Sequence, residues 1–164
     1  FDFLMDLFLK EFSDLTKDTR LEQYKIRINF IGRLQLFPQK IQQAMHELME
    51  RTKKHDSYIV NFAMAYGGKS EIVDATKKIA EQVKMGKLDI NQINEEMFSK
   101  NLYLSSEPDL IVRTAESRLS GFLPWQGAYA EIIFLPDVLW PEFSREHFEK
   151  CIEEYKSRQR RFGR

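Results

Sequence analysis

Residues 109–135 read DLIVRTAESRLSGFLPWQGAYAEIIFL. Two short apolar runs, DLIVRT and EIIFL, stand at the ends of this stretch, and turn-forming and apolar residues lie between them. Short apolar runs bounded by turn residues are typical of buried strands. We therefore predict a strand, a compact turn with an apolar helix, and a second strand, which is a pattern typical of α/β proteins.

Similar patterns predict further strands and helices elsewhere in the chain. The run 57–66 (SYIVNFAMAY) is almost continuously apolar, which is typical of a strand covered on both faces. Helix 1–15 is apolar around much of its circumference, so it either packs in a core or lines an apolar cavity, and we favour the core. The other expected elements are a strand at 25–32 and helices that begin near Pro38, at a Ser70 cap, around 91–99 and at a Ser144 cap.

Helices that alternate with short buried strands predict an α/β fold with a mainly parallel central sheet flanked by helices. The 164 residues are enough for one domain, 1–164, with its own core. Ligands of such sheets bind beyond the carboxyl ends of the strands. Arg113 and Thr114 lie at one such end, which makes the residues after them candidates for a binding site.

The composition excludes several classes of protein. Lys+Arg and Asp+Glu both number 25, so the chain lacks the basic excess of a nucleic-acid binder, and no nucleic-acid partner is expected. The single cysteine, Cys151, excludes an internal disulfide and fits a reducing compartment. No apolar run approaches the roughly 20 residues of a membrane span. We therefore expect a soluble, cytoplasmic protein.

The segment AYGGKS, residues 65–70, imitates the end of a phosphate-binding P-loop. The full motif needs a glycine five positions before Gly68, where this chain has Ala63. We therefore favour a tight turn between a strand and a helix over a nucleotide site. The three histidines have no metal-ligand spacing with one another or with Cys151, so a zinc site is not expected either.

The turn after the strand at 109–114 carries a candidate anion site. Arg113, Arg118 and Ser120 fall within eight positions. Guanidinium groups present paired donors that suit phosphate oxygens, and a serine hydroxyl adds a third directed bond. The alternative is a solvated turn in which Arg113 pairs with Glu116, and these residues alone do not decide between the two.

Glu131 stands at the start of the apolar run EIIFL, where an unpaired carboxylate would be costly to bury. A magnesium ion shared with a diphosphate would satisfy it, because Mg²⁺ takes few carboxylates and completes its shell with substrate oxygens. The alternative is an ion pair with a nearby arginine. A diphosphate held by Arg113, Arg118 and Ser120, a metal at Glu131 and hydrocarbon walls together suggest an isoprenoid diphosphate as the substrate.

Several motifs also resemble one known family. DLIVRTAESRLSGFLPWQGAYAEIIF, then DVLWPEF, then RQRRFG are similar to the C-terminal half of cis-prenyltransferases, the undecaprenyl and polyprenyl diphosphate synthases. NFAMAYGGKSEIV is similar to that family's Asn-x-Ala-x-x-Tyr-Gly-Gly segment, which replaces the P-loop interpretation. The likeness covers essentially the whole chain, as the C-terminal two-thirds of a family member, and the TAE-x-RLSGFLPWQ wording resembles the archaeal branch.

The resemblance implies cis-prenyl chain elongation, in which isopentenyl diphosphate attacks an allylic prenyl diphosphate, pyrophosphate leaves and a proton is lost. The product would be a polyprenyl diphosphate lipid carrier, formed in an apolar tunnel and released by peripheral contact with the membrane. The implied roles are diphosphate binding by Arg113, Arg118 and Ser120, magnesium binding by Glu131, contact with the partner's diphosphate site in a homodimer by Arg161 and Gly163, and tunnel walls at Phe8 and Tyr58.

The family's N-terminal Met-Asp-Gly-Asn-Gly-Arg segment, with its catalytic aspartate, has no counterpart in these residues, so no catalytic residue is assigned. We expect this chain alone to be inactive. The alternative function is a non-catalytic partner subunit of a heteromeric cis-prenyltransferase. Retention of Arg113, Arg118, Ser120 and Glu131 together favours the enzyme, because such subunits typically lose the residues that bind isopentenyl diphosphate. The allylic starter and the product length are not indicated.

Overall fold

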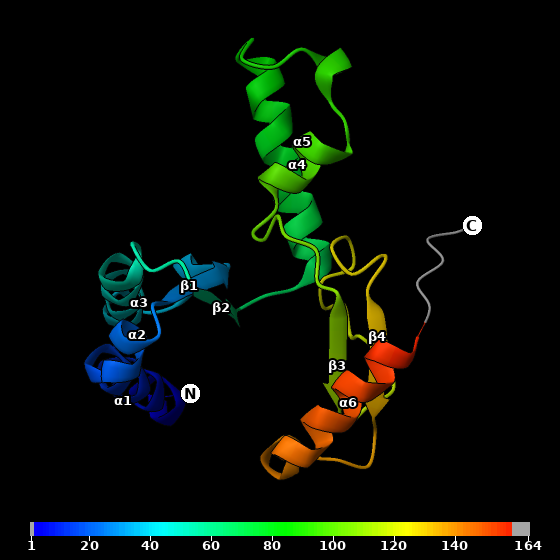
Figure 1. The fold of residues 1–164 in the computed structure, drawn as a ribbon. Coiled ribbons are helices and arrows are strands. Elements are labelled where there is room, and N and C mark those ends of the chain that lie inside the picture. Colours follow the sequence, from blue (N-terminus) through cyan, green and yellow to red (C-terminus); the bar gives the residue numbers. More distant parts are fainter. Residues whose placement is uncertain (1, 159–164) are drawn as a thin grey trace. The chain divides into compact units, whose positions relative to one another are not determined.

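In the computed structural model, which describes residues 2–158, the chain divides into two units, Phe1–Tyr66 and Gly67–Arg164. Each unit has its own pair of parallel strands and its own helices (Figure 1). The parallel pairing that the sequence predicts is therefore confirmed within each unit. The expectation of a single domain over 1–164 stays a prediction. No helix in the described part of the chain is long and apolar enough to cross a membrane.

The N-terminal unit is a βαβ arrangement preceded by two helices. Strand β1 pairs in parallel with β2, with Ile26 opposite Tyr58 and Gly32 opposite Met64. Parallel strands need a crossover connection, and a helix that begins directly after Pro38 supplies it. The elements are α1 (Asp2–Lys17), α2 (Thr19–Gln23), β1 (Ile26–Gly32), η1 (Leu34–Leu36), α3 (Gln39–Thr52) and β2 (Tyr58–Met64).

Helix α1 packs into the core of this unit, as the sequence favoured. Met5 and Phe12 are buried in a cluster with residues of α2, β1 and α3. The rings of Phe12 and Phe30 pack edge to face, with their centroids 4.9 Å apart. The rings of Phe8 and Phe12 are stacked, with their centroids 5.8 Å apart. Aromatic pairs in these geometries add to the free energy gained by burial. Core packing thus explains one face of α1, whereas Phe3, Leu4 and Leu7 are exposed.

Strand β2 is not covered on both faces within its unit, so this prediction is wrong for the unit itself. Tyr58 is 62% exposed, and Ile59, Val60 and Phe62 are exposed as well. An apolar run predicts burial only if neighbours cover both faces of the strand. Among the described residues only β1 pairs with β2.

The C-terminal unit contains the candidate anion site. Strands β3 and β4 pair in parallel, with Leu110 opposite Glu131 and Thr114 opposite Leu135. Ser144 caps the last helix, as predicted, by accepting a hydrogen bond from the His147 backbone N–H at 3.4 Å. The elements are α4 (Gly68–Lys84), η2 (Ile90–Gln92), α5 (Glu95–Asn101), β3 (Leu110–Thr114), β4 (Glu131–Leu135), η3 (Trp140–Glu142) and α6 (Arg145–Ser157).

Two local predictions for this unit are wrong. Helix α4 begins at Gly68 with Gly67 as its N-cap, so Ser70 lies inside the helix instead of capping it. No helix forms between β3 and β4, where residues 115–130 make consecutive turns. Ser120, Gly121 and Leu123 have positive φ angles of 51°, 79° and 46°. Left-handed residues interrupt a right-handed helix, which explains the turns.

Candidate functional site

The site lies where β3 ends and the chain turns sharply. Arg113 is the penultimate residue of β3, and Ala115, with φ 64°, begins the turn. Ser120 and Gly121 close it with two more positive φ angles. Such values are uncommon for residues with a Cβ atom and are tolerated where the surrounding structure imposes them. The resulting tight loop brings Arg118 and Ser120 back toward Arg113 at the carboxyl end of the strand.

The three predicted diphosphate ligands converge on one carboxylate, that of Glu116. Arg113 donates from Nη2 to Glu116 Oε2 at 2.6 Å, and Arg118 donates from Nη2 to Oε1 at 2.6 Å. Arg118 Nε and Ser120 Oγ also donate to Oε2, at 3.3 and 3.2 Å. The pairing of Arg113 with Glu116 that was the alternative interpretation is thus observed. It also demonstrates that all three side chains can hold a single anionic group.

The electrostatics of the loop follow from this pairing. Hydrogen bonds from Arg118 and then Arg113 lower the pKa of the Glu116 carboxyl to about 2. The same contact raises the pKa of Arg118. Because the pKa of Glu116 is lowered, the stabilisation from the pairing is present above the ordinary carboxyl pKa and is lost as the pH falls toward 2. An open hollow of about 320 Å³ is lined by Glu116, Ser117 and Arg118, so solvent reaches the site.

Glu131 begins β4, and its partner is an arginine. Arg158 donates from Nη1 to Glu131 Oε2 at 2.8 Å and to the Ile132 carbonyl oxygen at 3.2 Å. Its other terminal nitrogen, Nη2, donates to the Glu154 carboxylate. Hydrogen bonds to Glu131 and Glu154 raise the pKa of Arg158. The ion pair that was the alternative for Glu131 is therefore observed.

The structure does not bring Glu131 to the arginine cluster of the same chain. Glu131 lies opposite Leu110, whereas Arg113 lies opposite Phe134, three residues further along the strand pair. Three strand residues span about 10 Å, and side chains an odd number of positions apart point to opposite faces of the sheet. One magnesium ion shared by Glu131 and a diphosphate at Arg113 of the same chain does not fit this geometry. Among residues 2–158 no cluster of three or more His, Cys, Asp or Glu side chains could hold a metal.

The glycine turn before α4 contacts the loop that carries Ser120. The Gly68 backbone N–H donates to the Gly121 carbonyl oxygen at 3.0 Å. A Cβ atom on Gly68 would lie 2.2 Å from Pro124 Cδ and 2.4 Å from the Gly121 oxygen. Only glycine permits so close an approach. Gly68 of the AYGGKS segment therefore supports the loop that carries Ser120, a role that was not predicted from the sequence.

A buried carboxylate, Glu71, supports the same region and was also missed. It is 1% exposed and accepts hydrogen bonds from the backbone N–H groups of Tyr103 and Leu104, at 2.8 and 3.3 Å. Gln126 Nε2 donates to it at 3.0 Å and to the Leu104 carbonyl oxygen at 2.8 Å. These bonds tie α4 to the segment before β3 and to the loop before β4.

A signal for this role was present in the sequence. Glu71, Ala75 and Ile79 recur every four residues and are all buried, so the glutamate lies in line with the apolar stripe of α4. A carboxylate on a buried stripe needs partners, because an unpaired buried charge is costly.

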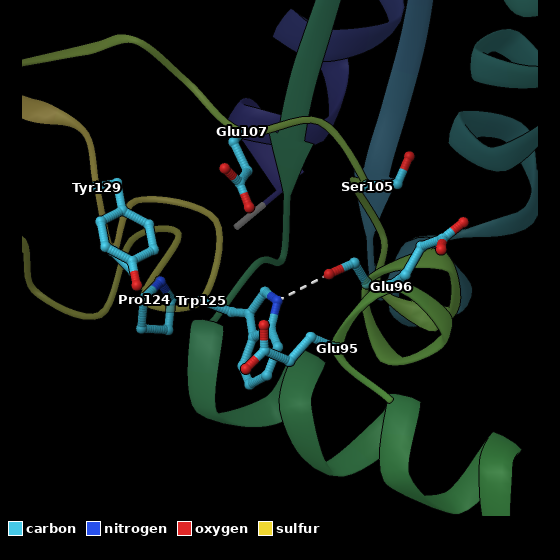
Figure 2. Close-up of a pocket in the computed structure, with 9 residues that line it drawn as sticks. Glu95, Glu96, Ser105, Glu107, Pro124, Trp125 and Tyr129 are labelled. Carbon is cyan, nitrogen blue, oxygen red and sulfur yellow. Dashed lines mark hydrogen bonds between the residues drawn. The ribbon is translucent and has the colours of Figure 1, made fainter. Parts of the chain in front are cut away.

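A second cavity, of about 520 Å³, lies beside the indole of Trp125 (Figure 2). Trp125 Nε1 donates a hydrogen bond to Ser99 Oγ at 2.9 Å, and the centroids of the Trp125 and Phe98 rings lie 4.5 Å apart. The carboxylates on its wall would repel a diphosphate, which favours the arginine cluster over this cavity as the candidate diphosphate site. Its lining residues are Glu95, Glu96, Ser99, Ser105, Glu107, Pro124, Trp125, Ala128 and Tyr129.

Of the other predicted site residues, two belong to the N-terminal unit and two lie outside the described residues. Phe8 and Tyr58 belong to the N-terminal unit, where Phe8 packs against the core and Tyr58 is exposed at the start of β2. Their place in a tunnel stays a prediction. Arg161 and Gly163 lie outside the described residues.

Comparisons with known proteins agree with the motifs. A family model described as putative undecaprenyl diphosphate synthase matches residues 1–163. A tritrans,polycis-undecaprenyl-diphosphate synthase (geranylgeranyl-diphosphate specific) of Methanocaldococcus jannaschii is 44% identical over 99% of this chain and 60% of its own length. The protein of the same name from Pyrococcus horikoshii is 46% identical over 99% of this chain and 62% of its own length. The chain thus spans about 60% of the length of these relatives.

Solved structures share the fold. Lavandulyl diphosphate synthase from Lavandula x intermedia, in complex with dimethylallyl diphosphate, has a TM-score of 0.92 and 32% identity, over 99% of this chain and 71% of that chain. A probable undecaprenyl diphosphate synthase from Campylobacter jejuni has a TM-score of 0.85 and 34% identity, over 99% of this chain and 74% of that chain.

Proposed function

The chain belongs to the undecaprenyl diphosphate synthase family. We propose that the full-length protein is a cis-prenyltransferase whose isopentenyl diphosphate site lies in this chain. The observation that carries the proposal is the convergence of Arg113, Arg118 and Ser120 on a single anion at the carboxyl end of β3. A non-catalytic partner subunit has no use for such a cluster. The enzyme is therefore the better supported of the two alternatives.

The proposed reaction joins isopentenyl diphosphate to an allylic prenyl diphosphate and repeats to form a polyprenyl diphosphate. The alkene carbon of isopentenyl diphosphate forms the new bond, pyrophosphate leaves the allylic carbon and a proton is lost. The two guanidinium groups and the hydroxyl would bind and orient the isopentenyl diphosphate and neutralise its charge. Because relatives are named as geranylgeranyl-diphosphate specific, we propose that substrate as the allylic starter.

The assembly is also a proposal. From the family resemblance we propose a homodimer in which Arg161 and Gly163 contact the partner's diphosphate site, and peripheral contact with the membrane when the product is released. We also propose that Phe8 and Tyr58 line the tunnel. For Glu131 we propose the magnesium role that the resemblance implies, with the ion's other ligands coming from outside the arginine cluster of the same chain.

The direct test supplies the full-length protein with labelled isopentenyl diphosphate and geranylgeranyl diphosphate. We expect chromatography to resolve a series of products, each longer than the last by one isoprene unit. If the full-length protein neither binds isopentenyl diphosphate nor gives an extended product, the partner-subunit alternative would be favoured.

The ion pair of Glu131 allows its magnesium role to be tested from both sides. If Glu131 binds magnesium, Arg158 competes for the carboxylate. Glu131→Gln should then raise the magnesium concentration needed for half-maximal turnover by roughly tenfold, because it removes a charged ligand. Arg158→Gln should lower that concentration, because it releases the Glu131 carboxylate from its ion pair. Kinetic titration of magnesium measures both. If both variants lose thermal stability by similar amounts and keep the magnesium dependence of the wild type, Glu131 is only a structural partner of Arg158.

Tyr58 tests the tunnel. If its phenol closes the tunnel floor, Tyr58→Ala should lengthen the products without changing the affinity for isopentenyl diphosphate, because a close-packed wall leaves no other space for chain growth. The control is Ile59→Ala, since neighbouring strand residues point to opposite faces. Chromatography of the products decides the point, and an unchanged length distribution for Tyr58→Ala would place this residue outside the tunnel.

A further inference from the structure

Glu116 has no assigned role in the proposed reaction, yet it is the centre of the site. Its carboxylate accepts hydrogen bonds from Arg113 Nη2, Arg118 Nη2, Arg118 Nε and Ser120 Oγ. These are donors that the bound diphosphate would need. The serine hydroxyl has a single proton, so it cannot donate to Glu116 and to a phosphate oxygen at once. Binding and the Glu116 contacts therefore compete.

We propose that Glu116 occupies the position of the substrate's diphosphate in the unliganded protein and is displaced when the diphosphate binds. This inference rests on the proposed function of the same site. A carboxylate resembles part of a phosphate group, since both offer oxygens that accept paired hydrogen bonds from arginine. Glu116 is thus a competing anion that pairs with both guanidinium groups until the substrate displaces it.

The local structure favours such an exchange. Without an anion between them, the guanidinium groups of Arg113 and Arg118 would repel each other. Glu116 lies inside the tight loop between Ala115 and Ser120, both of which have positive φ, so its carboxylate stays close to the arginines. Arg113 Nε is buried without a hydrogen-bond partner among the described residues. The pairing with Glu116 therefore leaves one donor of Arg113 unsatisfied, which costs free energy.

The exchange has a consequence for repeated elongation. After each condensation, the lengthened chain carries the diphosphate that came from isopentenyl diphosphate, because the allylic diphosphate is the leaving group. This group must leave the arginine cluster before the next isopentenyl diphosphate can bind. A carboxylate that competes for the same donors lowers the affinity of the cluster for its product and so speeds this step.

The test measures binding of inorganic diphosphate to the full-length protein by calorimetry. Glu116→Gln should tighten binding by roughly tenfold, because it removes a competing anion. The matched control is Glu146→Gln, which removes an ionised carboxylate that is paired with Lys150 on α6. The control should change binding by less than about twofold, which separates the local effect from the change in net charge.

Steady-state kinetics provide the second readout. For Glu116→Gln we expect a lower KM for isopentenyl diphosphate together with a lower kcat for repeated elongation, because the product leaves more slowly. A carboxylate that only orients the arginines would produce weaker diphosphate binding and a higher KM in the variant, and that result would overturn the inference while leaving the proposed function intact. Failure of the wild-type protein to bind either inorganic or isopentenyl diphosphate would overturn both.

Discussion

Replacing Arg113 by alanine should weaken binding of isopentenyl diphosphate by about 2 kcal/mol or more, because a charged donor to phosphate is lost. Arg113 is held in place by β3 and is only 38% exposed, so its guanidinium is more ordered than a free surface side chain. Part of the Arg113 side chain is buried, so its hydrogen bonds are less screened by solvent than those of an exposed arginine. Calorimetric titration of the full-length protein with isopentenyl diphosphate measures the loss.

The control for this variant is Arg145→Ala. Arg145 also pairs with a glutamate, Glu149, at 2.7 Å, but it lies on the surface of α6 and is 89% exposed. An exposed ion pair of this kind contributes little to folding stability, so the variant should fold normally and bind isopentenyl diphosphate as the wild type does. Binding of the allylic substrate should change less than that of isopentenyl diphosphate in Arg113→Ala. Equal losses for both substrates would show that the site is assigned to the wrong diphosphate.

Replacing Gly68 by alanine should destabilise the C-terminal unit by about 2–3 kcal/mol, because the new methyl group has no space. It would overlap Pro124 Cδ and the Gly121 carbonyl oxygen, and neither is the end of a flexible side chain. Relief requires the loop that carries Ser120 to move away from α4. We therefore expect lower stability in urea unfolding and, in the protein that remains folded, weaker binding of isopentenyl diphosphate.

The adjacent glycine provides the matched control. A Cβ atom on Gly67 would meet only Ser70, at an ordinary 3.7 Å, and the φ of Gly67 is −154°, which any residue adopts. Gly67→Ala should therefore cost less than about 1 kcal/mol, the difference between glycine and alanine at a helix N-cap. Similar losses of stability in both variants would mean that the close approach of Gly68 is not the cause.

Secondary structure was predicted correctly from the sequence where it depends on short apolar runs or on a single capping residue. The strands β1 to β4 were predicted from short apolar runs, and the cap at Ser144 from residue type. The segment between β3 and β4 was wrongly expected to contain a helix. Its apolar residues suit a helix, but Ser120 and Leu123 adopt positive φ angles, and the loop between them packs on Gly68 through Gly121. Residue type alone does not reveal such packing.

The predictions for the site divide in the same way. Arg113, Arg118 and Ser120 were selected from their chemistry and from the family resemblance, and the structure brings them together on Glu116. Glu131 was expected to share a magnesium ion with the bound diphosphate, because an unpaired carboxylate at the start of an apolar strand would be costly to bury. The parallel register instead places it at the other end of the strand pair, because the chain must return to the start of the sheet before β4 begins.

The α/β class, the strands and the candidate phosphate-binding side chains could thus be predicted from the sequence, because apolar periodicity and side-chain chemistry are properties of residues and their near neighbours. Packing in three dimensions established that one carboxylate, Glu116, accepts hydrogen bonds from all the candidate diphosphate-binding side chains. It also established that Gly68 supports their loop and that Glu71 and Gln126 tie distant segments together. Gly68 and Gly121, like Glu71 and Gln126, are joined across more than fifty residues of chain. Such contacts depend on how the elements pack, and packing is set by the whole unit and not by any short stretch of it.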